Sequence, residues 1–77
     1  MRIISQNGRY DFPYEELCFA IANDDRRKII AYSPNDSSHI CYEFGRYKTF
    51  ERTDEVFILM REMYCQHRPV FSFPKNE

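Results

Sequence analysis

Glu51–His67, with the sequence ERTDEVFILMREMYCQH, is the one long stretch of the chain that has the periodicity of an α-helix. At about 100° per residue, six of its side chains form the apolar stripe of a helix that lies on a sheet. Thr49 or Thr53 is expected to cap the amino end with its hydroxyl oxygen, and Pro69 to stop the helix. The stripe consists of Thr53, Phe57, Met60 and Tyr64, with Val56 and Met63 at its side.

Ile58 and Leu59 do not fit this stripe, because they fall on the flank and the back of the helix, where a solvated helix carries charge. If they are exposed beside Val56 or Met63, they form an apolar patch of the kind that marks an interface. We therefore predict a partner or oligomer interface at these four residues. We also expect a homo-oligomer, since two-fold self-association is the commonest kind. The alternative is a sheet that curls and buries the helix on nearly all sides.

Composition and charge limit the class of protein. The 77 residues predict a single domain (1–77), and a composition with 43% hydrophobic and 30% charged residues is globular. A net charge of −1 gives no general attraction to nucleic acid or to an anionic membrane. No apolar run approaches the roughly 18 residues of a membrane span, so we expect a cytoplasmic protein without a membrane partner. Three widely spaced cysteines make a poor disulfide framework.

The first 32 residues predict two hairpins. Ile3–Gln6 and Arg9–Phe12 flank Asn7-Gly8, the dipeptide that favours a two-residue type I′ turn. Such a loop pairs the strands so that the side chains of Ile3, Ser5, Tyr10 and Phe12 share the inner face. Two further apolar runs, Leu17–Ala22 and Lys28–Tyr32, flank a polar turn and predict the second hairpin.

Two more strands complete the expected fold. His39–Phe44 alternates in polarity, which predicts a half-buried strand that Gly45 breaks, and Val70–Phe73 predicts a short final strand before Pro74. The sequence therefore predicts an α+β fold, with a small antiparallel sheet of five to six short strands and one helix, at about 50–67, packed on one face.

Both ends of the chain carry short motifs. They are MRIISQNG at 1–8, DxPYE at 11–15, LMREMY at 59–64 after Tyr47, and VFxxP at 70–74. With these motifs the chain resembles a group of short uncharacterised proteins of Gram-positive bacteria and their phages, which open MRIISQDG…DxPYE and carry a late amphipathic helix. The middle of the chain, 23–45, does not match, and Phe50, Phe57 and Ile58 stand where the group has charged or small residues. The group has no settled activity, so the resemblance implies a mobile-element context and transfers no functional residue.

A metal or catalytic centre is not indicated. His39 and Cys41 on a strand, and Cys65 and His67 near the helix end, are zinc-ligand types. Side chains two positions apart on a helix point roughly 200° apart, so the second pair converges only where the helix frays. Ordinary half-buried residues are the favoured interpretation. Phosphate-binding and nucleophile motifs are absent, and we predict no enzymatic activity, no metal and no cofactor.

A ligand or nucleic-acid contact is the alternative function. The basic turn Arg26–Lys28 and the run Arg46-Tyr47-Lys48 combine cations with an aromatic ring, as single-strand platforms do, although nearby acidic residues weaken the field. Our main expectation is a small phage-type or prophage-type accessory protein that binds and modulates a host or phage protein, as a homo-oligomer. The alternative is a small-ligand, nucleotide or nucleic-acid binding module with a site at a subunit junction.

Overall fold

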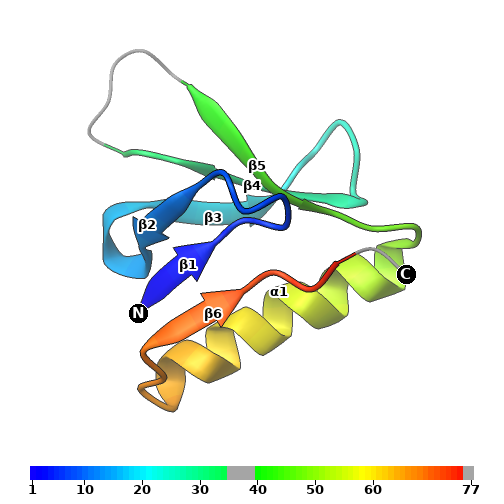
Figure 1. Ribbon diagram of the computed structural model, residues 1–77. Coiled ribbons are helices and arrows are strands. Elements are labelled where there is room, and N and C mark those ends of the chain that lie inside the picture. The colour runs from blue at the N-terminus through cyan, green and yellow to red at the C-terminus, as the bar shows by residue number, and fades with distance from the viewer. Residues whose placement is uncertain (35–39, 76–77) are drawn as a thin grey trace.

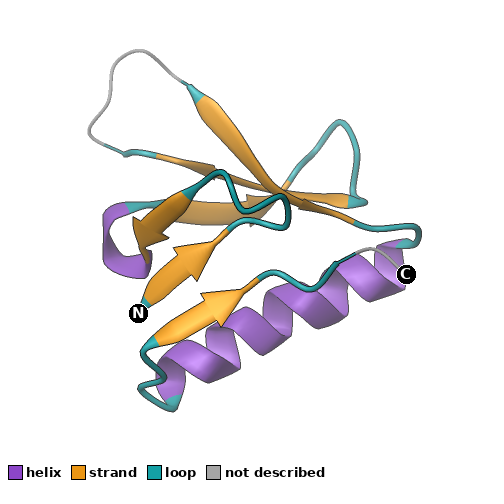
Figure 2. Ribbon diagram, in the orientation of Figure 1, coloured by secondary structure: helices purple, strands orange, loops and turns teal. Residues whose placement is uncertain are grey.

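The computed structural model describes residues 1–34 and 40–75, which form six short strands and one long helix (Figure 1). The helix runs along one side of the strands (Figure 2). The predicted α+β class is confirmed. The strands are β1 (Arg2–Ile4), β2 (Asp11–Pro13), β3 (Cys18–Ile21), β4 (Lys28–Tyr32), β5 (Cys41–Arg46) and β6 (Val70–Ser72), the helix is α1 (Phe50–Cys65), and a 3-10 turn covers Tyr14–Glu16.

The strands form two sheets, whereas the sequence predicted one antiparallel sheet. Their orders are β2–β1–β6 and β3–β4–β5. β6 runs parallel to β1, with Ile3 opposite Phe71, and the other pairs of the described residues are antiparallel. The parallel pair arises because α1 returns the chain to the end of the molecule where β1 begins, so that β6 then runs in the same direction as β1.

The first hairpin has the predicted register but a different turn. Ile3 pairs with Phe12, as predicted. A type I′ turn needs a positive φ at both central residues, but Gly8 has one (75°) and Asn7 does not. The Ser5 carbonyl accepts a hydrogen bond from Gly8 N at 2.9 Å, and the Asn7 side chain accepts one from Ser5 Oγ at 2.7 Å. The loop is therefore longer than two residues, and Gln6 does not pair within the hairpin.

β5 continues through Gly45 to Arg46, although the sequence predicted a break at the glycine. A Cβ at Gly45 would lie 2.7 Å from Phe73 Cδ2 and 3.0 Å from Tyr47 Cε2. The glycine is therefore required for close packing of these two rings rather than for a turn. β5 also has a bulge, where its register with β4 shifts by one residue.

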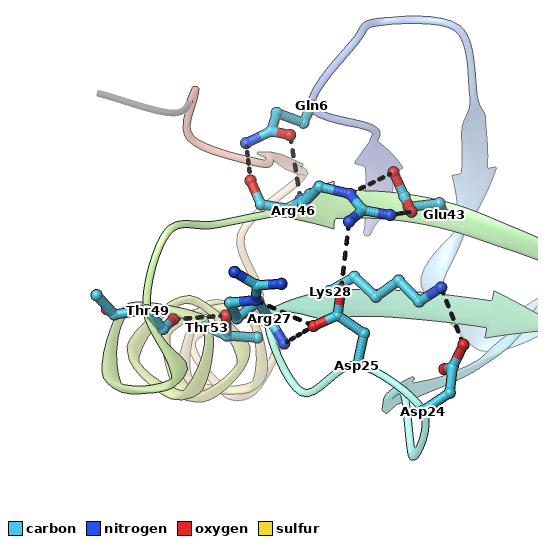
Figure 3. Close-up of polar contacts among 9 residues, drawn as sticks. All are labelled: Gln6, Asp24, Asp25, Arg27, Lys28, Glu43, Arg46, Thr49 and Thr53. Atoms are coloured by element: carbon cyan, nitrogen blue, oxygen red, sulfur yellow. Dashed lines mark hydrogen bonds and ion pairs between the residues drawn. The ribbon is translucent and has the colours of Figure 1, made fainter.

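Thr49 caps the amino end of α1, as one of the two predicted candidates. Its Oγ1 accepts a hydrogen bond from Arg52 N at 3.1 Å. The other candidate, Thr53, is buried, and its hydroxyl donates to the Thr49 carbonyl at 2.9 Å (Figure 3). The cap fixes the direction in which the chain leaves β5 and enters the helix.

The helix ends at Cys65, before the predicted stop at Pro69. His67 adopts a left-handed φ of 58°, and its N–H donates to the Tyr64 carbonyl at 3.0 Å. Arg68 N donates to the Met63 carbonyl at 3.1 Å. These two bonds satisfy carbonyl groups of the last turn, which is the usual way in which a left-handed residue closes a helix.

The core lies between the two sheets and α1. The helix buries Thr53, Val56 and Met60, so its core face is centred closer to Val56 than the sequence predicted. Tyr64, which was predicted on that face, is 37% exposed, and its ring stacks on Tyr14 with centroids 4.1 Å apart. The core cluster consists of Ile3, Ile29, Ala31, Phe44, Tyr47, Val56, Met60, Phe71 and Phe73.

Candidate interaction surface

The sheet β3–β4–β5 has two edges, and the chain itself covers the last part of the one formed by β5, at residues 44–46. Gln6, released from the first hairpin, donates its N–H to the Phe44 carbonyl at 2.7 Å. Its side-chain amide accepts from Arg46 N at 3.1 Å and donates to the Arg46 carbonyl at 3.0 Å (Figure 3). The same amide donates to the Pro74 carbonyl at 3.1 Å. Gln6 therefore occupies outward-facing main-chain groups that an added strand would need.

The opposite edge, formed by β3, has no such cover. β3 pairs with β4, and the ladder continues to the bond from Ala22 N to the Lys28 carbonyl at 3.1 Å. Hydrogen-bonded residues alternate along an antiparallel strand, so Ala20 also bonds toward β4. The N–H and C=O groups of Phe19 and Ile21 then face outward, and within residues 1–34 and 40–75 they have no main-chain partner.

β3 also lacks charge, proline and a bulge, which are three of the features that usually protect an edge strand. β2 ends in Pro13, and its Asp11 forms an ion pair with Arg2. β6 has three residues and lies between Pro69 and Pro74. β3 instead presents the uncharged sequence CFAI. It is thus the least protected edge in the described part of the molecule.

A groove of about 350 Å³ lies between the start of β3 and α1. Tyr14 and Phe19 both line the groove, and their rings stack with centroids 5.6 Å apart. Burial raises the pKa of Tyr14, and the positive charge of Arg61, which lines the same groove, partly opposes this rise. The lining residues are Tyr14, Leu17, Cys18, Phe19, Phe57 and Arg61.

The flank of α1 beside this groove is partly apolar. Phe50 lies at the far end of β3, in a depression that it shares with the turn 23–27. Helix positions 50, 54, 57 and 61 lie on one side, so Asp54 falls between Phe50 and the groove. Phe50 is 55% exposed and Ile58 is 52% exposed. We call the open edge of β3, together with the flank residues Phe50, Asp54, Phe57, Ile58 and Arg61, the β3–α1 surface.

The structure separates the four residues that the sequence predicted as an interface. Val56 is fully buried and belongs to the core, so it lines no surface. Leu59 and Met63 are half-buried and pack against the core cluster. Ile58 is exposed and lies on the β3–α1 surface. The predicted patch is therefore not contiguous.

Most of the predicted ligand-binding cations are engaged in ion pairs within the fold. Asp25 binds both Arg27 (3.2 Å) and Arg46 (3.2 Å), and Arg46 also binds Glu43 at 2.8 Å (Figure 3). Hydrogen bonds from the backbone and side chain of Arg27 lower the pKa of Asp25, and Arg46 adds to this. Lys28 lies 3.4 Å from the carboxylate of Asp24. The turn 23–28 and the end of β5 are thus tied together electrostatically.

Of the remaining predicted contact residues, Tyr47 is buried, and its hydroxyl donates to the Pro74 carbonyl at 2.8 Å. It is therefore a core residue and presents no ring for base stacking. Arg26 and Lys48 are exposed and share a depression of about 700 Å³. Its lining holds three acidic and three basic side chains, so it has no net charge to attract an anion: Asp24, Asp25, Arg26, Arg27, Lys48 and Glu51.

The four zinc-ligand types do not form a site within the described residues. His39 lies outside them. Cys41 begins β5, whereas Cys65 ends α1, and these two ends lie on different sides of the molecule in Figure 1. Cys18, Cys41 and Cys65 are free thiols, and residues 1–34 and 40–75 contain no group of three or more side chains placed to hold a metal ion.

Comparisons of the chain with protein-family models, with curated proteins and with solved structures find no match. In the described part of the chain, no helix is both long enough and apolar enough to pass through a membrane.

The β3 edge is the feature that the sequence analysis missed. The available signal was the composition of Leu17–Ala22, an uncharged run without proline. The pattern of that run predicts only a hairpin strand. Whether another segment covers the outer edge of β3 depends on where Gln6 and α1 pack. The sequence pattern of a hairpin does not predict that packing.

Proposed function

We propose that this chain is a protein-binding module that accepts an extended strand of another chain at the edge of β3. The observation that carries the proposal is the outward-facing, unpartnered main chain of Phe19 and Ile21 in an uncharged strand. Strand addition of this kind gains affinity from main-chain hydrogen bonds and specificity from pockets for alternate side chains. The groove lined by Tyr14, Phe57 and Arg61 supplies such a pocket.

The flank of α1 supports the same proposal. Phe50 and Ile58 are large apolar side chains that are more than half exposed; Phe50 lies beside the turn that follows β3, and Ile58 follows Phe57, which lines the groove. A strand added there would remove them from water, with a gain of about 25 cal/mol for each Å² of apolar area buried. Arg27, Lys28, Arg46 and Tyr47 are occupied within the fold, which favours a protein partner over a nucleotide or nucleic acid.

The biological role that we propose is that of an accessory protein which binds and modulates a host or phage protein. The resemblance of the chain's two ends to short proteins of Gram-positive bacteria and their phages supports this role. An exposed strand edge allows a chain of 77 residues to form a specific complex.

The test compares two lysine substitutions on edge strands. Ala20→Lys places an ammonium group on the open β3 edge without touching the core, whereas Ser72→Lys does the same on the protected strand β6. Each tagged variant is used to capture proteins from a lysate of a Gram-positive host. We expect a protein that binds the wild-type chain and Ser72→Lys but is lost with Ala20→Lys. A partner bound equally by all three chains would contradict the proposal.

A further inference from the structure

We infer that one occupant of the β3–α1 surface is a second copy of this chain, paired β3 to β3 in antiparallel orientation. This inference rests on the proposed function, since it uses the same open edge. The two-fold axis of this pair lies beside Ala20, and the order of charges along the flank of α1 favours this arrangement.

The strand itself is compatible with such a pair. Phe19 and Ile21 present the outward N–H and C=O groups, so an antiparallel copy bonds Phe19 to Ile21 of the second copy and Ile21 to Phe19 of the second copy. Ala20 then lies opposite its own equivalent, and its small side chain leaves the closest cross-strand position free of a clash. The two sheets of this type would join into one continuous six-stranded sheet.

The two helices would lie side by side. The axis of an antiparallel strand pair is perpendicular to the sheet, so both copies of α1 remain on the same face of the joined sheet. α1 runs antiparallel to β3, since Phe50 lies beside the end of β3 and Arg61 beside its start. The two copies of α1 therefore run antiparallel to each other, and the same flank of each helix faces the other helix.

This arrangement pairs opposite charges. Asp54 and Arg61 are exposed, and the ion pairs found among the described residues involve neither of them. An antiparallel pair of helices centred between Phe57 and Ile58 brings Asp54 opposite Arg61 of the second copy, and Arg61 opposite Asp54 of the second copy. Phe57 and Ile58 meet their equivalents near the axis, as the apolar centre of an interface does. Charge complementarity of this kind selects one orientation against its reverse.

Charge reversal provides the test. Asp54→Arg places two arginines opposite two arginines, and Arg61→Asp places two aspartates opposite two aspartates. We expect each single variant to weaken the dimer about 10- to 100-fold in Kd, measured by sedimentation equilibrium. We expect the double variant Asp54→Arg/Arg61→Asp to dimerise like the wild type. A mixture of the two single variants should form a heterodimer, because both of its cross-pairs are then opposite in charge.

The outcomes separate this inference from the proposed function. A wild-type dimer with rescue on mixing supports the inference. A dimer that both single variants leave unchanged overturns the pairing of Asp54 with Arg61, and a wild-type chain that is a monomer throughout overturns the second copy as occupant. In that last case, a protein partner lost with Ala20→Lys still supports the proposed function, whereas the absence of any such partner overturns both. Thermal unfolding of each variant confirms that the mutated chains are folded.

Discussion

The two edges of the sheet β3–β4–β5 differ in almost every respect. At β5, one glutamine from a distant loop makes four hydrogen bonds, to Phe44, Arg46 and Pro74, and a bulge interrupts the ladder. At β3, four uncharged residues pair with β4 without a bulge, and the main-chain groups of alternate residues face outward. An edge that a fold leaves unprotected is exposed to pairing with another chain, so such edges are normally blunted. From this contrast we propose that β5 serves stability and β3 serves association.

Phe44→Ala tests the β5 side with the largest expected effect. The Phe44 ring is fully buried and packs with the rings of Tyr10, Phe12, Phe19 and Phe73. Its loss should lower the free energy of unfolding by about 3–5 kcal/mol, from lost transfer energy and from the cavity left behind. Urea denaturation measures the change. A loss below about 1 kcal/mol would show that this side does not form the core.

The pH dependence of stability tests the same side. Burial raises the pKa of Tyr47 from 10.0 to about 12, so the folded state keeps the phenol proton that the unfolded state releases above pH 10.0. The stabilisation is complete below pH 10.0 and is lost as the pH rises toward 12, by at most about 2–3 kcal/mol. Unfolding curves across this window should show the decrease in the wild type. In Tyr47→Phe the decrease should be smaller, and what is left should come from other groups such as Tyr14, whose pKa burial also raises.

Gln6→Ala should have a smaller effect. It removes the side-chain hydrogen bonds to Arg46 and Pro74, each with a net value of about 1 kcal/mol, and we expect a loss of about 1–3 kcal/mol. Gln66→Ala, at the exposed end of α1, is the matched control and should change stability by less than about 0.5 kcal/mol. Equal effects of the two changes would remove the distinction between a covered edge and an ordinary surface.

Ala20→Lys should have the smallest effect on stability of the four. The side chain lies on the outer face of β3 and is half-buried, so the free energy of unfolding of the isolated chain should change by less than about 1 kcal/mol. Association should nevertheless be lost, because a lysine at an open edge opposes strand pairing. A strongly destabilised Ala20→Lys would mean that the β3 edge serves the fold rather than a partner.

The sequence predicted local structure better than it predicted how distant segments pack. The helix, its cap at Thr49 and the pairing of Ile3 with Phe12 follow from periodicity, hydroxyl chemistry and side-chain alternation, which act over a few residues. Gly45 was misjudged because its constraint comes from Phe73, a residue far away in the sequence.

The candidate site was predictable only in part, for the same reason. Ile58 could be identified because it falls outside the apolar stripe, and it is exposed. The sequence placed Val56 in the patch because a helical wheel does not show which face of a helix packs against two sheets. In the structure that face is centred near Val56. The pairing of Asp25 with Arg27 and Arg46, which neutralises the basic turn, depends on tertiary contacts that no local pattern records.

Residue-resolved amide hydrogen exchange over a series of protein concentrations tests the central claim most directly. The amides of Ala20 and Ala22, which bond to β4, should be protected at every concentration. Those of Phe19 and Ile21 should exchange rapidly in dilute solution and become protected as the concentration rises or as a captured partner is added. Phe19 and Ile21 amides that stay unprotected under all of these conditions would contradict the assignment of β3 as the edge at which this chain binds.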